Sequence, residues 1–118
     1  PYNCFVREDT QIPFMTMPDA IGAIIQIMSA PRRNLSQFVY NIRSFAPTAE
    51  EFRVKLMEFY PNAEIEYEVN EKRQKMVDGW PMDTDDSVAK KEWDWQPYHD
   101  LNKGLDEYLI PDLKERYL

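Results

Sequence analysis

The chain has 118 residues, a formal net charge of −7, 43% hydrophobic residues and 30% charged residues. This apolar content can build a core, which excludes a disordered tail. The acidic balance argues against nucleic-acid binding, because phosphate recognition needs clustered lysines and arginines. No apolar run is long enough to span a membrane.

The first half of the sequence predicts alternating strands and helices. Residues 2–6 have the composition of a short strand. Pro18 and Asp19 mark the start of a helix, which Pro31 stops. A second strand is expected over residues 38–42. The helix carries apolar residues at helical spacing, namely Ile21, Ile24, Ile25 and Met28.

A capping box and an alternating run define the middle of the chain. Thr48 and Glu51 form the T-x-x-E pattern of a helix start, and Pro61 ends that helix. Residues 64–69 alternate between glutamate and apolar side chains, which is typical of a half-buried strand. Residues 71–77 allow a short helix. This succession of strands and helices predicts an α/β fold.

The last third predicts a turn followed by helices. Residues 78–81 form the turn, and the acidic stretch 83–87 caps a helix that runs to Trp93. Asp100 caps another helix. Pro111 should break or kink it, because proline lacks the N–H that a helix needs.

The sequence contains no catalytic or metal-binding pattern that stands out. Cys4 is the only cysteine, which excludes an internal disulfide and suits a reducing compartment. A pair between Cys4 and His99 lacks an orienting third group, and we expect His99 on the surface near a helix start. The acidic residues 83–86 fail as a calcium loop, since Val88 and Asp94 occupy the positions that need Gly and Glu.

Trp80 stands between Gly79 and Pro81, away from any periodic apolar stripe. A large aromatic on a stiffened turn is either a core residue or the wall of a pocket, and the residues alone leave both open. The three glycines are widely spaced, so no dinucleotide-binding fingerprint exists in this chain.

Many short segments, in order along the chain, resemble NAD-dependent L-threonine 3-dehydrogenases, which are extended short-chain dehydrogenases related to sugar-nucleotide epimerases. The matching segments are residues 15–21 (M-T-M-P-D-A-I), 40–41, 44–45, 48–51, 73–74, 78–81 (D-G-W-P), 85–89, 94–95 and 100–101. Two positions depart from the family: Thr16 replaces an aromatic residue, and Gly79 replaces Ser or Thr.

The resemblance implies oxidation of L-threonine at its 3-hydroxyl, with hydride transfer to NAD and formation of 2-amino-3-oxobutanoate. It implies that residues 1–118 are the C-terminal substrate-binding portion of a Rossmann-like fold, a single domain or fragment whose cofactor half is absent. NAD would bind to that upstream half, and the complete enzyme would be a homodimer. It would be cytoplasmic in a prokaryote and mitochondrial in a eukaryote.

The resemblance also assigns site residues. Trp80, Thr16 and Arg73 are the expected substrate-binding residues. Arg73 could bind a sugar-nucleotide pyrophosphate in the related epimerases, although we favour a salt bridge to a neighbouring carboxylate. No tyrosine has a lysine four residues later, so no catalytic residue of the family's Tyr/Lys type lies in this chain. Two alternatives remain: a sugar-nucleotide epimerase or reductase, and a non-catalytic binding or assembly module.

Overall fold

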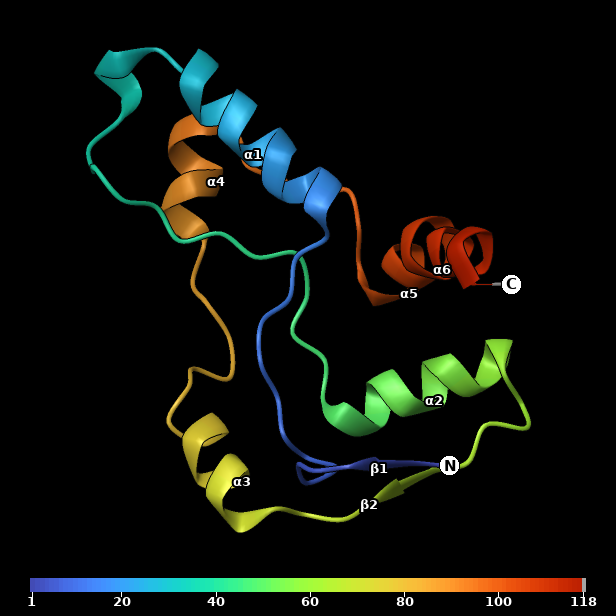
Figure 1. The fold of residues 1–118 in the computed structure, drawn as a ribbon. Helices are drawn as coiled ribbons and strands as arrows, with labels where there is room; N and C mark the ends of the chain where they lie inside the picture. The colour runs from blue at the N-terminus through green and yellow to red at the C-terminus, as the bar shows by residue number, and fades with distance from the viewer. Residues whose placement is uncertain (118) are drawn as a thin grey trace. The chain divides into compact units, whose positions relative to one another are not determined.

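The computed structural model describes residues 1–117, which gather into two compact units. Residues 1–13 and 46–83 form the first unit, whereas residues 14–45 and the chain from 84 onward form the second. Each unit therefore combines two stretches that are far apart in sequence. In Figure 1 the first unit combines the blue N-terminal segment with the green and yellow middle of the chain. The second unit combines a light-blue segment with the orange and red C-terminal part.

The first unit contains a pair of short parallel strands and two helices (Figure 1). The strands are β1 (Tyr2–Cys4) and β2 (Ile65–Tyr67). Parallel neighbours need a long crossover, and α2 (Ala49–Phe59) lies in the connection between them. α3 (Glu71–Val77) follows β2. The paired residues are Tyr2 with Ile65, Asn3 with Glu66, and Cys4 with Tyr67.

The predicted capping box is confirmed at the start of α2. The Glu51 N–H donates to Thr48 Oγ1 at 3.1 Å, and the Thr48 N–H donates to Glu51 Oε2 at 2.8 Å. The carboxylate of Glu50 accepts hydrogen bonds from Arg53 and from the Tyr67 hydroxyl, which ties α2 to β2. These bonds lower the pKa of Glu50 to about 2. Burial, and then the bond to Glu50, raises the pKa of Tyr67 to about 12.

The second unit is helical. Its elements are α1 (Met17–Ser29), a 3-10 turn (Arg32–Asn34), α4 (Ser87–Trp93), α5 (Leu101–Lys103), a π-helical stretch (Gly104–Leu109) and α6 (Ile110–Tyr117). Its core contains two indoles, Trp93 and Trp95, with ring centroids 5.8 Å apart. Ala23 of α1 and Ala89 of α4 are buried with them. Within residues 1–117, no helix has the length and apolar character needed to cross a bilayer.

The strand expected over residues 38–42 is not formed, and that prediction was wrong. The stretch is irregular, and Phe38 is 93% exposed. Its attachment comes from side chains instead: the Tyr40 hydroxyl and the Ser36 hydroxyl both donate to the carboxylate of Glu92 on α4. Aromatic and β-branched content favours a strand only where another strand edge is available for backbone pairing.

Pro111 does not break the last helix as expected. The helical run continues from α5 to Tyr117, and the wider π-helical turns stand just before the proline. Just before the proline the backbone bonding is π-helical: the Ile110 N–H donates to the Leu105 carbonyl, five residues back.

The predicted apolar stripe of α1 faces outward. Its four side chains, Ile21, Ile24, Ile25 and Met28, are between 53% and 80% exposed, and the neighbouring Met17 is 60% exposed. The opposite side of α1 buries Asp19 and Ala23. Asp19 is the only charged residue in the helix, so the outward face carries no charge. Such a face is typical of an element that further protein covers.

We expect the 118-residue chain to self-associate and to bind a hydrophobic dye. Covering roughly 200 Å² of apolar surface at about 25 cal/mol per Å² is worth about 5 kcal/mol, which is comparable with the stability of a small domain. Replacing both Ile24 and Met28 with lysine should suppress association and dye binding without unfolding the chain. Light scattering and dye fluorescence measure these effects.

A buried position on the same helix provides the control. Ala23 is 1% exposed, so Ala23→Lys should unfold the second unit rather than solubilise it. A wild-type chain that is monomeric, melts cooperatively and does not bind the dye would contradict the expectation for the outward face.

Candidate functional site

A hydrogen-bond network anchors the turn that follows α3 in the first unit. The carboxylate of Asp78 accepts two guanidinium N–H groups of Arg7, at 2.9 and 3.2 Å. Gln74 is buried, donates from Nε2 to Asp78 at 2.7 Å, and accepts the backbone N–H of Arg7 at 2.7 Å. The hydrogen bonds from Arg7, and then from Gln74, hold the pKa of the Asp78 carboxyl below its usual range.

Trp80 ends this turn, and its side chain is 51% exposed. The backbone N–H groups of Gly79 and Trp80 donate to the carbonyls of Met76 and Val77, at 3.2 and 2.9 Å. Gly79 does not adopt a positive φ. A Cβ at Gly79 would lie 3.3 Å from the Met76 carbonyl oxygen, and glycine therefore permits this close approach.

Arg73 stacks on an aromatic ring. Its guanidinium carbon lies 4.8 Å from the ring centroid of Phe5. The salt bridge that we favoured for Arg73 is not formed with any carboxylate in residues 1–117. Cation–π stacking uses the face of the guanidinium and leaves its N–H edge available for an anionic partner.

A buried polar cluster joins three stretches of the second unit. Oδ2 of Asp19 accepts the Ser44 hydroxyl at 2.7 Å and the His99 backbone N–H at 3.1 Å, while Oδ1 accepts the Tyr98 N–H at 3.1 Å. The hydroxyl of Thr16 lies 2.9 Å from Nδ1 of His99. Thr16 also caps α1, because its hydroxyl accepts the Asp19 N–H.

The hydrogen bonds of this cluster outweigh the cost of burying a charge. Burial alone raises the pKa of Asp19, but the donors from Ser44, His99 and Tyr98 together lower it below its ordinary value. Asp19 therefore stays ionised at neutral pH, and it lies at the positive end of the α1 dipole. The cluster fixes the start of α1 against the chain before α5.

The sequence-predicted substrate residues are divided between the two units. Arg73 and Trp80 belong to the first unit, and Thr16 belongs to the second. Thr16 is 8% exposed: its hydroxyl is engaged by His99 and its methyl carbon approaches Gly104, where a Cβ would lie 3.4 Å away. Sequence reasoning missed this cluster and wrongly placed His99 on the surface, although it is 7% exposed. Its bonds join residues 80 positions apart, and no local pattern signals them.

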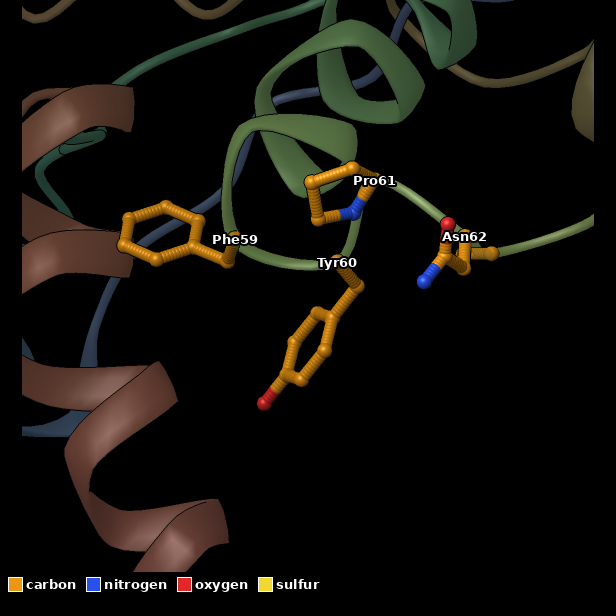
Figure 2. A pocket seen from close by; sticks show the side chains of 5 residues that line it. Phe59, Tyr60, Pro61 and Asn62 are labelled. Atoms are coloured by element: carbon orange, nitrogen blue, oxygen red, sulfur yellow. The ribbon is translucent and has the colours of Figure 1, made fainter.

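A shallow cavity of about 470 Å³ lies at the C-terminal end of α2 (Figure 2). Consecutive residues line it: Phe59, Tyr60, Pro61, Asn62 and Ala63. The lining has no charged group and no sequence-predicted site residue, so this cavity offers little for binding a zwitterion. No group of three His, Cys, Asp or Glu side chains suited to a metal occurs within residues 1–117.

The chain is similar to curated L-threonine dehydrogenases and epimerases. It is 36% identical to the mitochondrial L-threonine 3-dehydrogenase of Bos taurus over 100 residues, which is 85% of this chain and 27% of that protein. It is 33% identical to an uncharacterized epimerase/dehydratase of Staphylococcus haemolyticus over 116 residues, which is 98% of this chain and 36% of that protein. No protein-family model matches the chain.

Solved structures give the same result. A partial consensus L-threonine 3-dehydrogenase superposes with a TM-score of 0.89 and 38% identity, covering 98% of this chain and 37% of that one. The holo form of a GalE-like L-threonine dehydrogenase from Cupriavidus necator superposes with a TM-score of 0.86 and 38% identity, covering 94% and 36%. The resemblance to these dehydrogenases is confirmed, as an α/β match to about a third of their length.

We expect Asp19→Asn to lower the free energy of unfolding by about 1–3 kcal/mol at pH 7, since the amide cannot accept from all three donors. Because folding lowers the pKa of Asp19, its stabilisation is complete above the unfolded value of about 4 and is lost as the pH falls through the lower folded value. The difference between wild type and Asp19→Asn should therefore shrink below about pH 4. Urea melts across this range measure it.

Asp100 provides a matched control. It caps α5 by accepting the Lys103 N–H at 2.9 Å, and asparagine is an equally good cap, so Asp100→Asn should change little. A stability difference for Asp19→Asn that stays constant from pH 7 to pH 3 would show that the charge of Asp19 is not what the cluster requires.

Proposed function

We propose that this chain is the C-terminal, substrate-covering portion of an NAD-dependent L-threonine 3-dehydrogenase. In the complete enzyme, the 3-hydroxyl of L-threonine would be oxidised to give 2-amino-3-oxobutanoate, with hydride passing to NAD. The observation that carries the proposal is the match to L-threonine dehydrogenases along nearly all of the chain, at 38% identity and a TM-score of 0.89. The name of the bovine relative places that protein in mitochondria, which agrees with the reducing intracellular compartment expected for this chain.

The geometry of Trp80 supports a substrate contact. An exposed indole on a turn with a rigid base can be covered by a ligand, whereas a core indole cannot. Threonine is small and zwitterionic, so its pocket needs an apolar wall against the methyl group beside polar partners. Trp80 would provide that wall and exclude water from the reacting hydroxyl.

Arg73 and Thr16 would contribute to substrate binding in different ways. The N–H edge of Arg73 would reach the carboxylate of the substrate, because stacking on Phe5 holds the guanidinium plane. The hydroxyl and methyl group of Thr16 already have partners in the second unit. Thr16 would therefore contribute by holding the start of α1 in place rather than by donating to the substrate.

The residues of this chain do not fit the pyrophosphate of NAD. Such a site needs a glycine-rich turn that opens a helix, and here Gly22, Gly79 and Gly104 stand far apart and none has a positive φ. NAD binding and the proton transfer therefore belong, in our proposal, to the upstream half of the enzyme. That half would also form the homodimer.

The 33% identity to an uncharacterized epimerase/dehydratase supports a second candidate, a sugar-nucleotide enzyme of the same superfamily. In that case Arg73 would bind the pyrophosphate of the substrate. Calorimetric titration of the complete enzyme with L-threonine and with a nucleotide sugar separates the two. A complete protein that binds neither would instead support a non-catalytic binding or assembly module.

We expect the 118-residue chain alone to bind NAD weakly and to produce no NADH from L-threonine. The reason is that it lacks both the glycine-rich turn and the Tyr/Lys pair that the resemblance requires. Absorbance at the NADH band during incubation with L-threonine and NAD measures this. NADH production by the chain alone would contradict the proposal that hydride and proton transfer depend on an upstream half.

Trp80→Ala in the complete enzyme should lower kcat/KM for L-threonine by an amount equivalent to about 1–3 kcal/mol, the scale of losing an apolar pocket contact. The melting temperature should change little, because the indole is half exposed. Steady-state kinetics and a thermal melt measure the two effects.

Two control variants test whether the effect is specific to the indole of Trp80. Trp80→Phe keeps an aromatic wall and should retain most of the activity. Met82→Ala removes a neighbouring side chain that is 63% exposed and should have little effect. Wild-type threonine kinetics in Trp80→Ala would remove Trp80 from the substrate site.

A further inference from the structure

We propose that Asp78, held by Arg7 and Gln74, is a positioning residue that sets where the Trp80 indole stands. This inference rests on the proposed contact between Trp80 and the substrate. Asp78 touches no substrate in this scheme; it acts two residues before the indole, through the backbone of the turn.

The Trp80 indole has no polar anchor of its own. Its side chain is half exposed, and within residues 1–117 its indole makes no hydrogen bond or ring contact. Only its backbone is tied, through the bond from its N–H to the Val77 carbonyl. The direction of the indole therefore depends on the backbone from Asp78 to Trp80.

Asp78 is the point at which this backbone is attached to the rest of the first unit. Arg7 grips the carboxylate with two N–H groups, which fixes orientation as well as distance. The residues in this bond are 71 positions apart, so the turn after α3 is locked to the segment that leaves β1.

Gln74 gives the attachment its rigidity. Its side chain is 4% exposed, and both its amide oxygen and its amide nitrogen have partners. The oxygen holds the backbone N–H of Arg7, while the nitrogen holds Asp78, so one buried amide aligns the two partners of the ion pair. The Arg7 and Asp78 side chains are 46% and 44% exposed, so the buried amide of Gln74 is the part of the network that fixes the geometry.

Helix capping does not explain Asp78. It stands at the C-terminal end of α3, where the helix dipole disfavours a negative charge. Its electrostatic partner is Arg7 and not the helix. A displacement of about 1 Å in a group that contacts the substrate can cost about a hundredfold in rate, so a rigid attachment here has a functional consequence.

A double-mutant cycle in the complete enzyme tests the inference. Asp78→Asn should lower kcat/KM for L-threonine by on the order of tenfold, the scale of coupling within one hydrogen-bond network. In the Trp80→Ala background, the same substitution should have almost no further effect, because the group that it positions is gone. If instead the two losses multiply, Asp78 does not act through Trp80 and the inference is overturned.

Two controls separate positioning from general destabilisation. Glu58→Gln removes another exposed ion pair of the first unit, between Glu58 and Lys55, and should leave kcat/KM unchanged in both backgrounds. Arg7→Lys keeps the charge but loses the two-pronged grip, and it should reproduce most of the Asp78→Asn loss. Full activity in Arg7→Lys would show that the two-N–H geometry of the Arg7–Asp78 ion pair is not required, which would overturn the inference.

A second measurement does not depend on the substrate. Hydrogen exchange at the Gly79 and Trp80 amides of the complete enzyme, without substrate, reports how firmly the turn is held. Asp78→Asn should accelerate exchange at these two amides several-fold, and Glu58→Gln should not. If the complete enzyme neither binds nor oxidises L-threonine but this acceleration appears, the proposed function is wrong. The role of Asp78 in positioning the turn is then still supported. Unchanged exchange in Asp78→Asn would overturn the inference.

Discussion

The buried carboxylate of Asp19 is the interaction on which the second unit depends. A buried charge is costly unless donors surround it, and Asp19 receives one hydroxyl and two backbone N–H groups. Those donors come from Ser44 and from residues 98–99, so satisfying the charge brings three stretches of chain to one place. The start of α1, the end of the irregular stretch and the entry to α5 are positioned together as a result.

The first unit follows the same principle at Asp78. Its donors come from Arg7 and Gln74, and they connect the segment after β1 to the turn after α3. In both units a carboxylate is thus the centre of a network that joins segments distant in sequence. The difference is burial: Asp19 lies inside its unit, whereas Asp78 lies at the base of an exposed turn. A rigid base with an exposed indole beyond it suits a residue that contacts a ligand.

The outward face of α1 shows that the described residues do not account for all of their own apolar surface. A 13-residue helix with one charged side chain, which is buried, is unusual in a chain with 30% charged residues. Depletion of charge is typical of the centre of a stable interface rather than of a solvated surface. This agrees with a chain that spans 27% to 37% of the length of the proteins that it resembles.

Local rules in the sequence predicted most of the secondary structure. The Thr48–Glu51 capping box, the proline at the start of α1 and the alternation around β2 each depend on residues within one or two turns of chain. The strand expected over residues 38–42 failed because a strand requires a partner edge, and composition does not supply one. The break expected at Pro111 did not occur, and the irregularity there is a π-helical stretch just before the proline.

The sequence by itself determined the helix starts, the α/β character, the apolar stripe of α1 and the family resemblance, since these depend on short segments and their order. Only the tertiary structure decided that His99 is buried beside Thr16 and Asp19, that Arg73 stacks on Phe5, and that Asp78 is gripped by Arg7. These contacts join residues about 70 to 80 positions apart. The contacts of His99 form because a buried polar group needs a partner. For all three contacts, which partner lies within reach is a property of the folded chain alone.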